Sequence, residues 1–376
     1  MPLRSTIAAV WGVVLCAFFI QTGNGLQSDL IGIKADSLFA STIIGLMFAS
    51  YYVGFSLAPF AGRAVIRRVG HVAAVSVAMA AAAVVILVMP LLVSAPAWTA
   101  FRFVSGFCLS FSYIAVESWI NAAVPNQSRG RVFSAYMVAQ MIGMTLAQVL
   151  FGVGRSGHYS PYVMAALMFV LAGLPVVLSR GSTPSGTPPS PLSIAALFRR
   201  SPAGAAATVL SGLSWSILFT FGPIYARRIG FDTGGVGLLM GLAVLTGSLV
   251  QLPVGWLSDV AGRRRVLLLV FGGGLVAAML GLMADGAAMN LAVAALAGGF
   301  VFPIYAIAIS TVNDAVAPET RVAAASGLVL LFGAGSVFGP LLCGWAMDSI
   351  GLAGFYGLVA ATMTAGIAAT ALTRTH

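Results

Sequence analysis

The stretch GWLSDVAGRRRV, residues 255–266, is a short polar loop set between two long apolar runs. Gly255 and Gly262 permit a tight turn and a close approach between helices, because glycine has no Cβ. Asp259 can accept hydrogen bonds from a neighbouring helix N-terminus or from an arginine. The arginines at 263–265 hold the loop in water at the membrane surface. The stretch therefore predicts a sharp loop between two membrane-spanning helices.

The composition of the whole chain fits membrane-spanning helices on both sides of this loop. Hydrophobic residues make up 60% of the 376 positions and charged residues 7%, too few charges to coat a soluble protein of this length. A bilayer core of about 30 Å needs roughly 20 apolar residues per helix. We therefore predict an all-α polytopic membrane protein. The twelve segments expected to span the membrane lie near residues 7–27, 38–62, 71–94, 97–122, 132–153, 160–179, 204–226, 233–257, 266–284, 288–313, 322–345 and 352–373.

The basic residues fix the expected orientation, because cytoplasmic loops are enriched in Lys and Arg. With the N-terminus inside, fourteen basic residues lie on the inner face: Arg4, Arg63, Arg67, Arg68, Arg129, Arg131, Arg180, Arg199, Arg200, Arg263, Arg264, Arg265, Arg321 and Arg374. Four lie outside, namely Lys34, Arg155, Arg227 and Arg228, and Arg102 lies within a helix. The net charge of +10 therefore indicates cytoplasmic termini and contact with anionic lipid, and not nucleic-acid binding.

A polar stretch at residues 179–202 divides the helices six from six. Its segment STPSGTPPSP is too rich in Pro, Gly and Ser for a packed helix. The following LSIAALFRR is expected to form one or two turns at the inner interface, with its arginines toward the headgroups. We predict an N-terminal six-helix bundle at 1–179, a cytoplasmic linker at 180–203 and a C-terminal six-helix bundle at 204–376.

The two halves also resemble each other in sequence. Residues 126–148 align with 318–339 at an offset of 190, which pairs Arg131 with Arg321. A shift of 192 pairs Gly70 with Gly262. Two six-helix repeats in the same orientation are the arrangement of parallel-repeat transporters.

These loops resemble the signatures of a known family. The stretch at 255–266 is similar to the G-x-L-x-D-x-x-G-R-R-R loop of the major facilitator superfamily. RFVSG at 102–106 resembles the R-x-x-x-G motif of its fourth helix, and PNQSRGR (125–131) and PETR (318–321) stand where its P-x-x-x-R-G-type loops follow helices four and ten. The resemblance covers the whole chain. It implies two six-helix bundles that move a solute by alternating access.

Further stretches refine this resemblance. The segments GNGLQSDLIGIKA and ESWINAAVPNQSRGR look like a bacterial branch of largely uncharacterised transporters. Two departures argue against a generic drug antiporter. Arg67 stands in the first half where the second half has Asp259, and the fifth helix lacks the usual Gly-Pro pair.

The resemblance implies that helices one, four, seven and ten line the substrate cavity. Polar and aromatic residues share one face on each of these helices, which suits a small-ligand site. Interhelical hydrogen bonding is the alternative explanation. The candidate cavity residues are Gln21, Asn24, Tyr113, Glu117, Asn121, Trp215, Tyr305 and Asn313, with Ser28, Ser211, Ser214, Phe302 and Ile309 on the same faces and Gln140 and Gln148 as weaker candidates on helix five.

Glu117 interrupts an apolar run, where a carboxylate costs about 2.5–3.5 kcal/mol at mid-membrane. Three roles are open: a proton-binding group, an anion facing a cationic substrate, or an inner gate paired with Arg67, Arg129 or Arg131. Arg102 is expected to pair with an acid, to shape an outer gate or, as the family motif implies, to take part in proton coupling; the alternative is that its head extends to the interface. The remaining candidate gating-loop residues are Gly255, Asp259, Gly262, Arg263, Arg264 and Arg321.

Other polar residues have simpler expected roles. Asp29 and Asp285 lie near predicted outer helix ends and are expected to be solvated. Asp314 is expected to cap its helix or pair locally, and His158 to be exposed in a short outer loop. The three cysteines fall inside predicted helices and are interpreted as packing residues. Acids and histidines show no metal-ligand spacing, and no nucleophile–base pair stands out.

The sequence thus predicts a monomeric secondary transporter of the bacterial inner membrane, without a cofactor or metal and without enzymatic activity. Its partners are a small, neutral or singly charged organic solute, membrane lipids and, by extension, protons. The alternatives are an uncoupled facilitator and a non-transporting receptor on the same fold.

Overall fold

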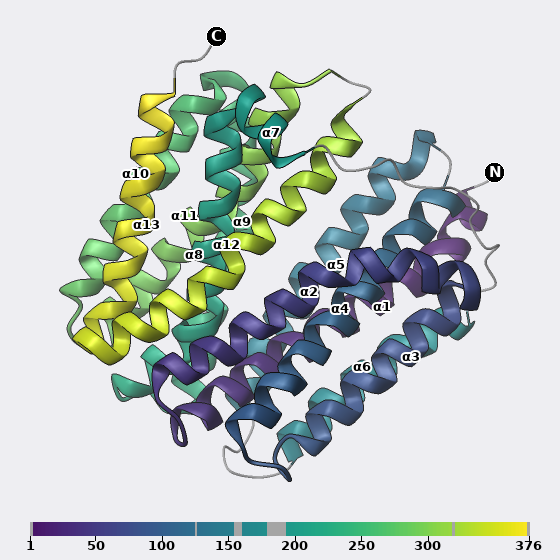
Figure 1. Ribbon diagram of the computed structural model, residues 1–376, viewed down its shortest axis with the longest axis horizontal. Coiled ribbons are helices and arrows are strands. Elements are labelled where there is room, and N and C mark those ends of the chain that lie inside the picture. Colours follow the sequence, from purple (N-terminus) through teal and green to yellow (C-terminus); the bar gives the residue numbers. More distant parts are fainter. Residues whose placement is uncertain (1–2, 125, 154–159, 179–192, 318–319, 374–376) are drawn as a thin grey trace. The chain divides into compact units, whose positions relative to one another are not determined.

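The computed structural model describes residues 3–124, 126–153, 160–178, 193–317 and 320–373, and Figure 1 shows them as helices joined by short connections. No strand occurs in these residues. The thirteen helices are α1 (Leu3–Asp36), α2 (Ser41–Val69), α3 (His71–Val88), α4 (Ala95–Ala123), α5 (Asn126–Val153), α6 (Ser160–Leu178), α7 (Ile194–Arg200), α8 (Pro202–Arg228), α9 (Thr233–Ala261), α10 (Arg263–Leu282), α11 (Ala287–Ala315), α12 (Arg321–Ile350) and α13 (Ala353–Leu372).

Each of the twelve long helices overlaps one predicted membrane segment, and the predicted all-α membrane fold is confirmed. Eleven of them are long and apolar enough to cross a bilayer by length and composition. The other, α1, begins before the predicted 7–27 and continues to Asp36. The prediction ended α1 too early because polar residues follow position 20, whereas the structure buries several of them and keeps them helical.

Local sequence explains where several helices begin. Ser94 caps α4 by accepting the backbone N–H of Ala97, and Asp232 caps α9 by accepting the N–H of Gly235 at 2.7 Å. Pro202 stands at the first turn of α8, where its missing N–H costs no helical bond. Side-chain acceptors and proline thus set these starts, as their usual cap preferences predict.

The contacts divide the chain into two compact units. The first unit comprises Met1–Ile31 and Ser50–Thr187, and the second comprises Gly32–Ala49 and Pro188–His376. Within the first, α3 packs against α4 and α6. Within the second, α8 packs against α12, α9 against α11, and α10 against α13. The end of α1 and the start of α2 therefore belong with the second unit, and the predicted boundaries near 179 and 204 stay predictions.

The two halves repeat the same backbone contacts at the predicted offset of 192 residues. A Cβ on Gly106 would meet the backbone oxygen of Tyr51, and one on Gly298 would meet that of Ala243, 192 positions later in both helices. Gly70 and Gly262, which end α2 and α9, have positive φ values of 81° and 92°. Close helix crossings and loop geometry are thus shared by the halves.

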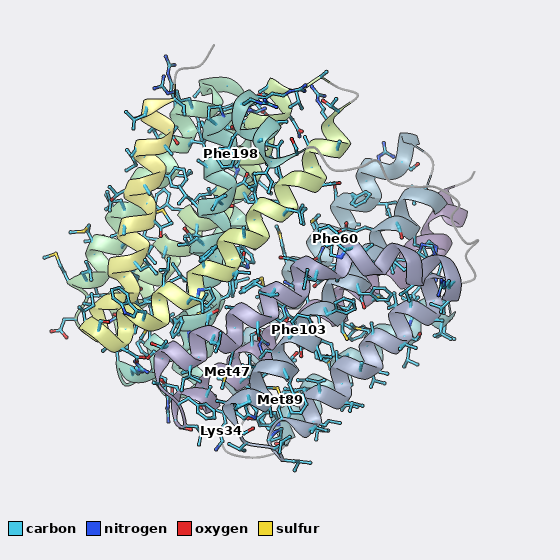
Figure 2. All side chains as sticks on the ribbon, viewed as in Figure 1. Lys34, Met47, Phe60, Met89, Phe103 and Phe198 are labelled. Atoms are coloured by element: carbon cyan, nitrogen blue, oxygen red, sulfur yellow. The ribbon has the colours of Figure 1, made fainter. Side chains whose placement is uncertain are left out.

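The short helix α7 lies on the second unit. Leu197 is fully buried in a cluster with Ala205, Val312 and Leu328, whereas Phe198 is 39% exposed and both terminal arginines are exposed. Phe198 lies at the end of this unit opposite Lys34, as Figure 2 shows. The one or two turns expected in this segment form, and their placement at the inner interface stays a prediction.

Candidate functional site

In the first unit, the predicted cavity residues of α1 and α4 bond to one another. The Tyr113 hydroxyl donates to the Gln21 side-chain oxygen at 2.5 Å, and both residues are half-buried. The Tyr51 hydroxyl on α2 donates to Asn24 Oδ1 at 3.3 Å. The face predicted from the i, i+3 spacing of Gln21 and Asn24 is therefore a polar surface shared by three helices.

Glu117 bonds to a residue that the sequence did not single out. The Tyr136 hydroxyl on α5 donates to Glu117 Oε1 at 3.1 Å, and Tyr136 is fully buried. A buried tyrosine hydroxyl needs a hydrogen-bond partner. A tyrosine within a predicted membrane-spanning helix is therefore the signal that could have identified Tyr136. The described residues form no ion pair with Glu117.

The residues proposed to pair with Glu117 at an inner gate are only partly described. Arg131 is exposed at the start of α5. The side chains of Arg67, Arg129 and Asn121 lie outside the described residues, as does His158. The three roles of Glu117 therefore stay open.

Arg102 does not extend to the interface. It is 1% exposed, and its guanidinium carbon lies 4.4 Å from the centre of the Tyr51 ring. The snorkelling alternative is therefore wrong, because the cation–π contact and the surrounding helices hold the head inside the bundle. Tyr51 joins Arg102 to Asn24, so the arginine belongs to the same polar surface.

The prediction for Asp29 is also wrong. This residue is 1% exposed, and its Oδ2 has no hydrogen-bond partner among the described residues. Helix α1 continues past it to Asp36. Asp285, for which the same prediction was made, is exposed. Next to Asp29 in sequence, Gln27 Nε2 donates to Ser105 Oγ on α4 at 2.9 Å.

The second unit contains a group of neighbouring aromatic rings on α8, α11 and α12. The ring centre of Trp215 on α8 lies 4.5 Å from that of Phe219 and 4.7 Å from that of Phe302 on α11. The rings of Tyr305 and Phe332 lie 4.8 Å apart. We call the partly exposed part of this set, Trp215, Phe219, Tyr305 and Phe332, the aromatic face.

The other candidate residues of the second unit make their described contacts within that unit. Ser211 and Ser214 donate to the carbonyls of Thr208 and Leu210, so their hydroxyls are turned into α8. Ile309 packs against the buried cluster around Leu197. The backbone carbonyl of Asn313 accepts a bond from Arg321, and its Oδ1 has no hydrogen-bond partner among the described residues.

The loop at residues 255–266 contains a polar network around Arg263. This residue pairs with Asp259 one turn earlier, bonds Asp314 Oδ2 at 3.0 Å and donates to Ser258 Oγ at 2.5 Å. Arg264 donates to the last carbonyls of α13, those of Thr370 and Ala371. The partner of Asp314 is therefore 51 residues away in the chain, on α10, and the expected local pairing is wrong.

The two glycines of this loop differ. Gly262 has a φ of 92°, which favours glycine, and forms the turn between α9 and α10. No described atom lies within 4 Å of a Cβ built on Gly255, so the expected close approach is not present at this residue.

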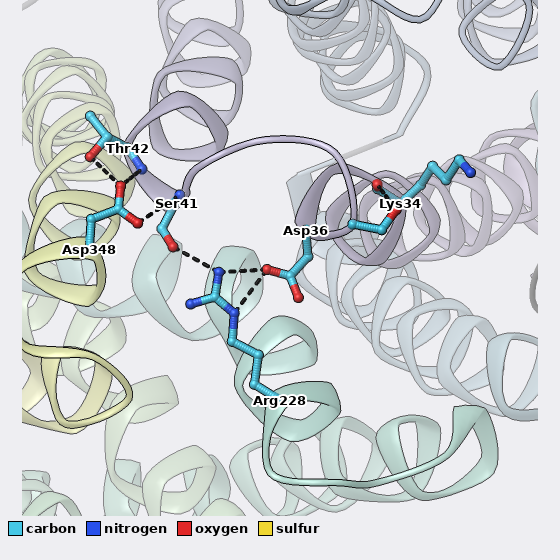
Figure 3. Close-up of polar contacts among 7 residues, drawn as sticks. Lys34, Asp36, Ser41, Thr42, Arg228 and Asp348 are labelled. Atoms are coloured by element: carbon cyan, nitrogen blue, oxygen red, sulfur yellow. Dashed lines mark hydrogen bonds and ion pairs between the residues drawn. The ribbon is translucent and has the colours of Figure 1, made fainter.

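A second polar cluster, which the sequence did not predict, joins the end of α1 and the start of α2 to α8 and α12. Arg228, in the last turn of α8, bonds Asp36 Oδ1 through Nε at 2.9 Å and through Nη2 at 2.6 Å, and also donates to Ser41 Oγ at 2.9 Å (Figure 3). Asp36 is the last residue of α1 and Ser41 the first of α2. The arginine thus contacts both ends of the α1–α2 connection.

The same cluster includes a helix cap supplied from a distant part of the chain. Asp348 in the last turn of α12 accepts the backbone N–H of Ser41 at 3.0 Å and that of Thr42 at 2.7 Å (Figure 3). A carboxylate at a helix N-terminus satisfies free N–H groups and favours the helix dipole. We call Asp36, Ser41, Thr42, Arg228 and Asp348 the clasp; all five belong to the second unit.

The described residues contain no group of three or more His, Cys, Asp or Glu side chains arranged to hold a metal ion. Cys16, Cys108 and Cys343 are buried inside α1, α4 and α12, where cysteine packs as a small apolar residue.

Comparison with known proteins agrees with the geometry. The family model described as Major Facilitator Superfamily matches residues 10–247 and 204–376. An "Uncharacterized MFS-type transporter YcaD" from Salmonella enteritidis PT4 is 27% identical over 363 residues, which cover 92% of this chain and 90% of that relative. The one from Salmonella arizonae is 27% identical over 328 residues, 85% of this chain and 80% of the relative.

Two solved structures share the fold. The nucleoside transporter NupG has a TM-score of 0.82 at 14% identity, covering 96% of this chain and 97% of that one. A bacterial homologue of the human lysosomal transporter Spinster, in an inward-facing and occupied conformation, has a TM-score of 0.76 at 16% identity, covering 99% and 96%.

Proposed function

Because the chain belongs to the major facilitator superfamily and is a multi-pass membrane transporter, we propose that it is a secondary transporter of small organic solutes that works by alternating access. The observation that carries the substrate class is the contrast between the two units. The first offers hydroxyl, amide and carboxyl groups at Tyr113, Gln21 and Glu117, and the second offers the aromatic face.

This contrast fits a solute with an apolar or ring-shaped part and a hydrogen-bonding part. Aromatic rings bind apolar or planar groups, and a small number of polar groups fixes their orientation. Glu117 is a half-buried acid without a described ion-pair partner, and it favours a neutral or singly positive solute over an anion. Asn121 and Asn313 are proposed as further polar contacts.

Coupling to protons is the proposed source of energy. Glu117, bonded to Tyr136, and Arg102, held over Tyr51, are ionisable groups inside membrane-spanning helices, where such residues commonly mark ion pathways. An uncoupled facilitator is the alternative, and a receptor that binds without transport is a second.

The loops and termini complete the proposal. Both termini would lie in the cytoplasm. The inner gate would be formed by the loop from Gly255 to Arg264 together with Arg67, Arg129, Arg131 and Arg321. The protein would act as a monomer in the inner membrane, with anionic lipid around its basic loops.

The test begins with a thermal-shift screen of metabolites and drugs on the purified chain, because a ligand stabilises the folded state by RT ln(1 + [L]/Kd). Each stabilising compound is then followed in proteoliposomes with an imposed pH gradient. Accumulation driven by the gradient supports coupled transport. Equilibration that ignores the gradient supports the facilitator, and binding without movement supports the receptor.

A further inference from the structure

A cavity of about 280 Å³ opens at one end of the second unit, between two turns of the chain. Residues 229–231 belong to the turn that joins α8 to α9, and residues 284–286 belong to the turn that joins α10 to α11. We call it the turn cavity. None of the described candidate residues for the solute site lines it, so it is a separate place on the molecule.

The equivalent place in the first half holds a much larger side chain. Shifted by 192 residues, α4 coincides with α11 from end to end, and the last residue of α1 coincides with that of α8. Asn290, which lines the turn cavity, then corresponds to Trp98. Trp98 is fully buried, and its Nε1 donates to the carbonyls of Met89 and Leu92 at 2.9 and 3.0 Å. The fold therefore does not require a cavity at this place, and the second half has a small amide where the first has an indole.

Hydrogen bonds hold the walls of the turn cavity in position. Asn290 is 4% exposed; its Nδ2 donates to the carbonyl of Gly286 at 2.9 Å, and its Oδ1 accepts the hydroxyl of Tyr225 on α8 at 3.1 Å. On the opposite wall, the N–H of Phe231 donates to the carbonyl of Ala226 at 3.1 Å. Both turns are thus bonded to the ends of their helices, and a preorganised site loses less entropy when a ligand binds.

The turn cavity carries a single negative charge. Asp285 is the one charged residue among the described residues that line it. It is exposed and forms no ion pair with any described residue. The two arginines that end α8 are engaged elsewhere, since Arg227 donates to the carbonyl of Phe231 and Arg228 pairs with Asp36. The carboxylate is therefore free to meet a cation that enters the cavity.

The rest of the lining selects the kind of cation. A calcium ion takes about six to eight oxygen ligands, whereas the described residues contain no group of three or more metal-binding side chains. An ammonium group needs only one carboxylate for a charge-assisted hydrogen bond. The carbon skeleton attached to it can lie against Ile229, Phe231 and Ala287. Pockets for drug-sized ligands have volumes of about 300–1,000 Å³, so a cavity of this size takes a smaller molecule.

We propose that the turn cavity binds a small organic ammonium ion, with the ammonium group on Asp285 and the apolar part against Ile229 and Phe231. The first half has Val93 and Trp98 where the second has Asp285 and Asn290, so the site belongs to one half only. Because the site is separate from the solute cavity, the proposal does not rest on the proposed function.

The test uses three small molecules that share a benzene ring and differ in charge. Benzylammonium, benzyl alcohol and benzoate are titrated against the purified full chain in detergent at pH 7 and low salt. Binding is measured by equilibrium dialysis against protein-free micelles. We expect benzylammonium to bind more tightly than benzyl alcohol, and benzoate to bind most weakly. Asp285→Asn should weaken the binding of benzylammonium about three- to tenfold and remove its advantage over benzyl alcohol.

A second variant tests the cavity without changing its charge. Ala284→Leu introduces the residue that the first half carries at the equivalent position, Leu92, and should abolish binding by filling the space. Ala288→Leu is the matched control, because Ala288 is exposed and does not line the cavity. Glu117→Gln removes the acid of the solute site and should leave the Asp285-dependent binding unchanged.

Three results would overturn the proposal. The first is equal affinity of the wild type and Asp285→Asn for benzylammonium. The second is binding that is lost in Glu117→Gln and kept in Asp285→Asn, since the ligand would then occupy the solute site. The third is displacement of benzylammonium by calcium chloride at constant ionic strength, which would assign the site to a metal ion. Each of these results leaves solute transport in proteoliposomes to be decided by its own measurement.

Discussion

Asp348 caps the helix that begins at Ser41, 307 residues earlier in the chain, by accepting the backbone N–H groups of its first turn. Helix caps normally come from the residue that precedes the helix. Here the carboxylate comes from the last turn of α12, so the start of α2 is tied to another helix. Substitutions in the clasp are therefore expected to change the stability of the folded chain measurably.

Replacing Asp348 by Asn should weaken the cap. The substitution removes the charge and one acceptor, and loss of a cap costs about 1 kcal/mol. We expect a lower midpoint of thermal unfolding in detergent. Ser349→Ala is the matched control, because Ser349 bonds only the carbonyl of Trp345 in its own helix. Equal midpoints for Asp348→Asn and the wild type would show that the cap contributes nothing.

The ion pair between Arg228 and Asp36 should contribute modestly. Their side chains are 29% and 13% exposed, and partly exposed pairs are worth about 0–1 kcal/mol. A double-mutant cycle with Arg228→Gln and Asp36→Asn, measured by thermal unfolding, isolates the pair. Arg227→Gln is the control, since Arg227 bonds the carbonyl of Phe231 and not the clasp. Strict additivity of the two changes would contradict a direct interaction.

Removing the charge of Glu117 should uncouple transport from protons. Glu117→Gln keeps an oxygen that can accept from Tyr136 but cannot ionise, so we expect movement of the solute that no longer responds to a pH gradient. Tyr136→Phe leaves Glu117 without its described partner and should reduce the rate, with Tyr162→Phe on α6 as the control. A response to the gradient that survives in Glu117→Gln would place coupling elsewhere.

Truncating Trp215 should weaken solute binding. Trp215→Ala removes one ring of the aromatic face, and a single ring–ring contact with a solute is worth about 0.5–1.5 kcal/mol, or roughly a 2- to 12-fold increase in Kd. Trp215→Phe should recover part of the affinity. Affinity is measured by thermal-shift titration of a compound from the screen. Trp256→Ala, at a residue 66% exposed on α9, should have no effect; if it weakens binding equally, the aromatic face is not the cause.

Replacement by alanine should change the free energy of unfolding in opposite directions at the two glycines of the 255–266 loop. Gly262 has a φ of 92°, so Gly262→Ala should destabilise the chain by about 1–2 kcal/mol. Gly255 lies within α9 with open space around it, so Gly255→Ala should stabilise it by about 0.4–1 kcal/mol through lower entropy of the unfolded chain. Thermal unfolding of both variants tests the pair, and shifts of the same sign would contradict the assigned geometry.

The features that follow from short stretches of sequence could be predicted. Apolar length located all twelve long helices, and the distribution of glycines and arginines identified the loops and the offset between the halves. Helix periodicity also placed Gln21 and Tyr113 on faces that meet. Each of these features depends on the length of an apolar run relative to the bilayer or on residues close together in the chain. Both can be read directly from the sequence.

The predictions that failed concern burial at a helix end. Asp29 and Asp285 look alike in sequence, since each lies near the end of an apolar run, but one is enclosed and the other exposed. Burial depends on which helices surround a residue, and hydropathy in one segment carries no information about the neighbours. Arg102 is the same case, because the ring that holds it belongs to α2.

The sequence by itself determined that this protein is a helical membrane transporter with two related halves, because bilayer thickness and loop charge act on each segment separately. Only the tertiary structure decided that Asp348 caps α2, that Tyr136 bonds Glu117 and that the ring of Tyr51 holds Arg102. Those contacts join residues far apart in the chain, and their energies depend on how the helices pack, which no local pattern encodes.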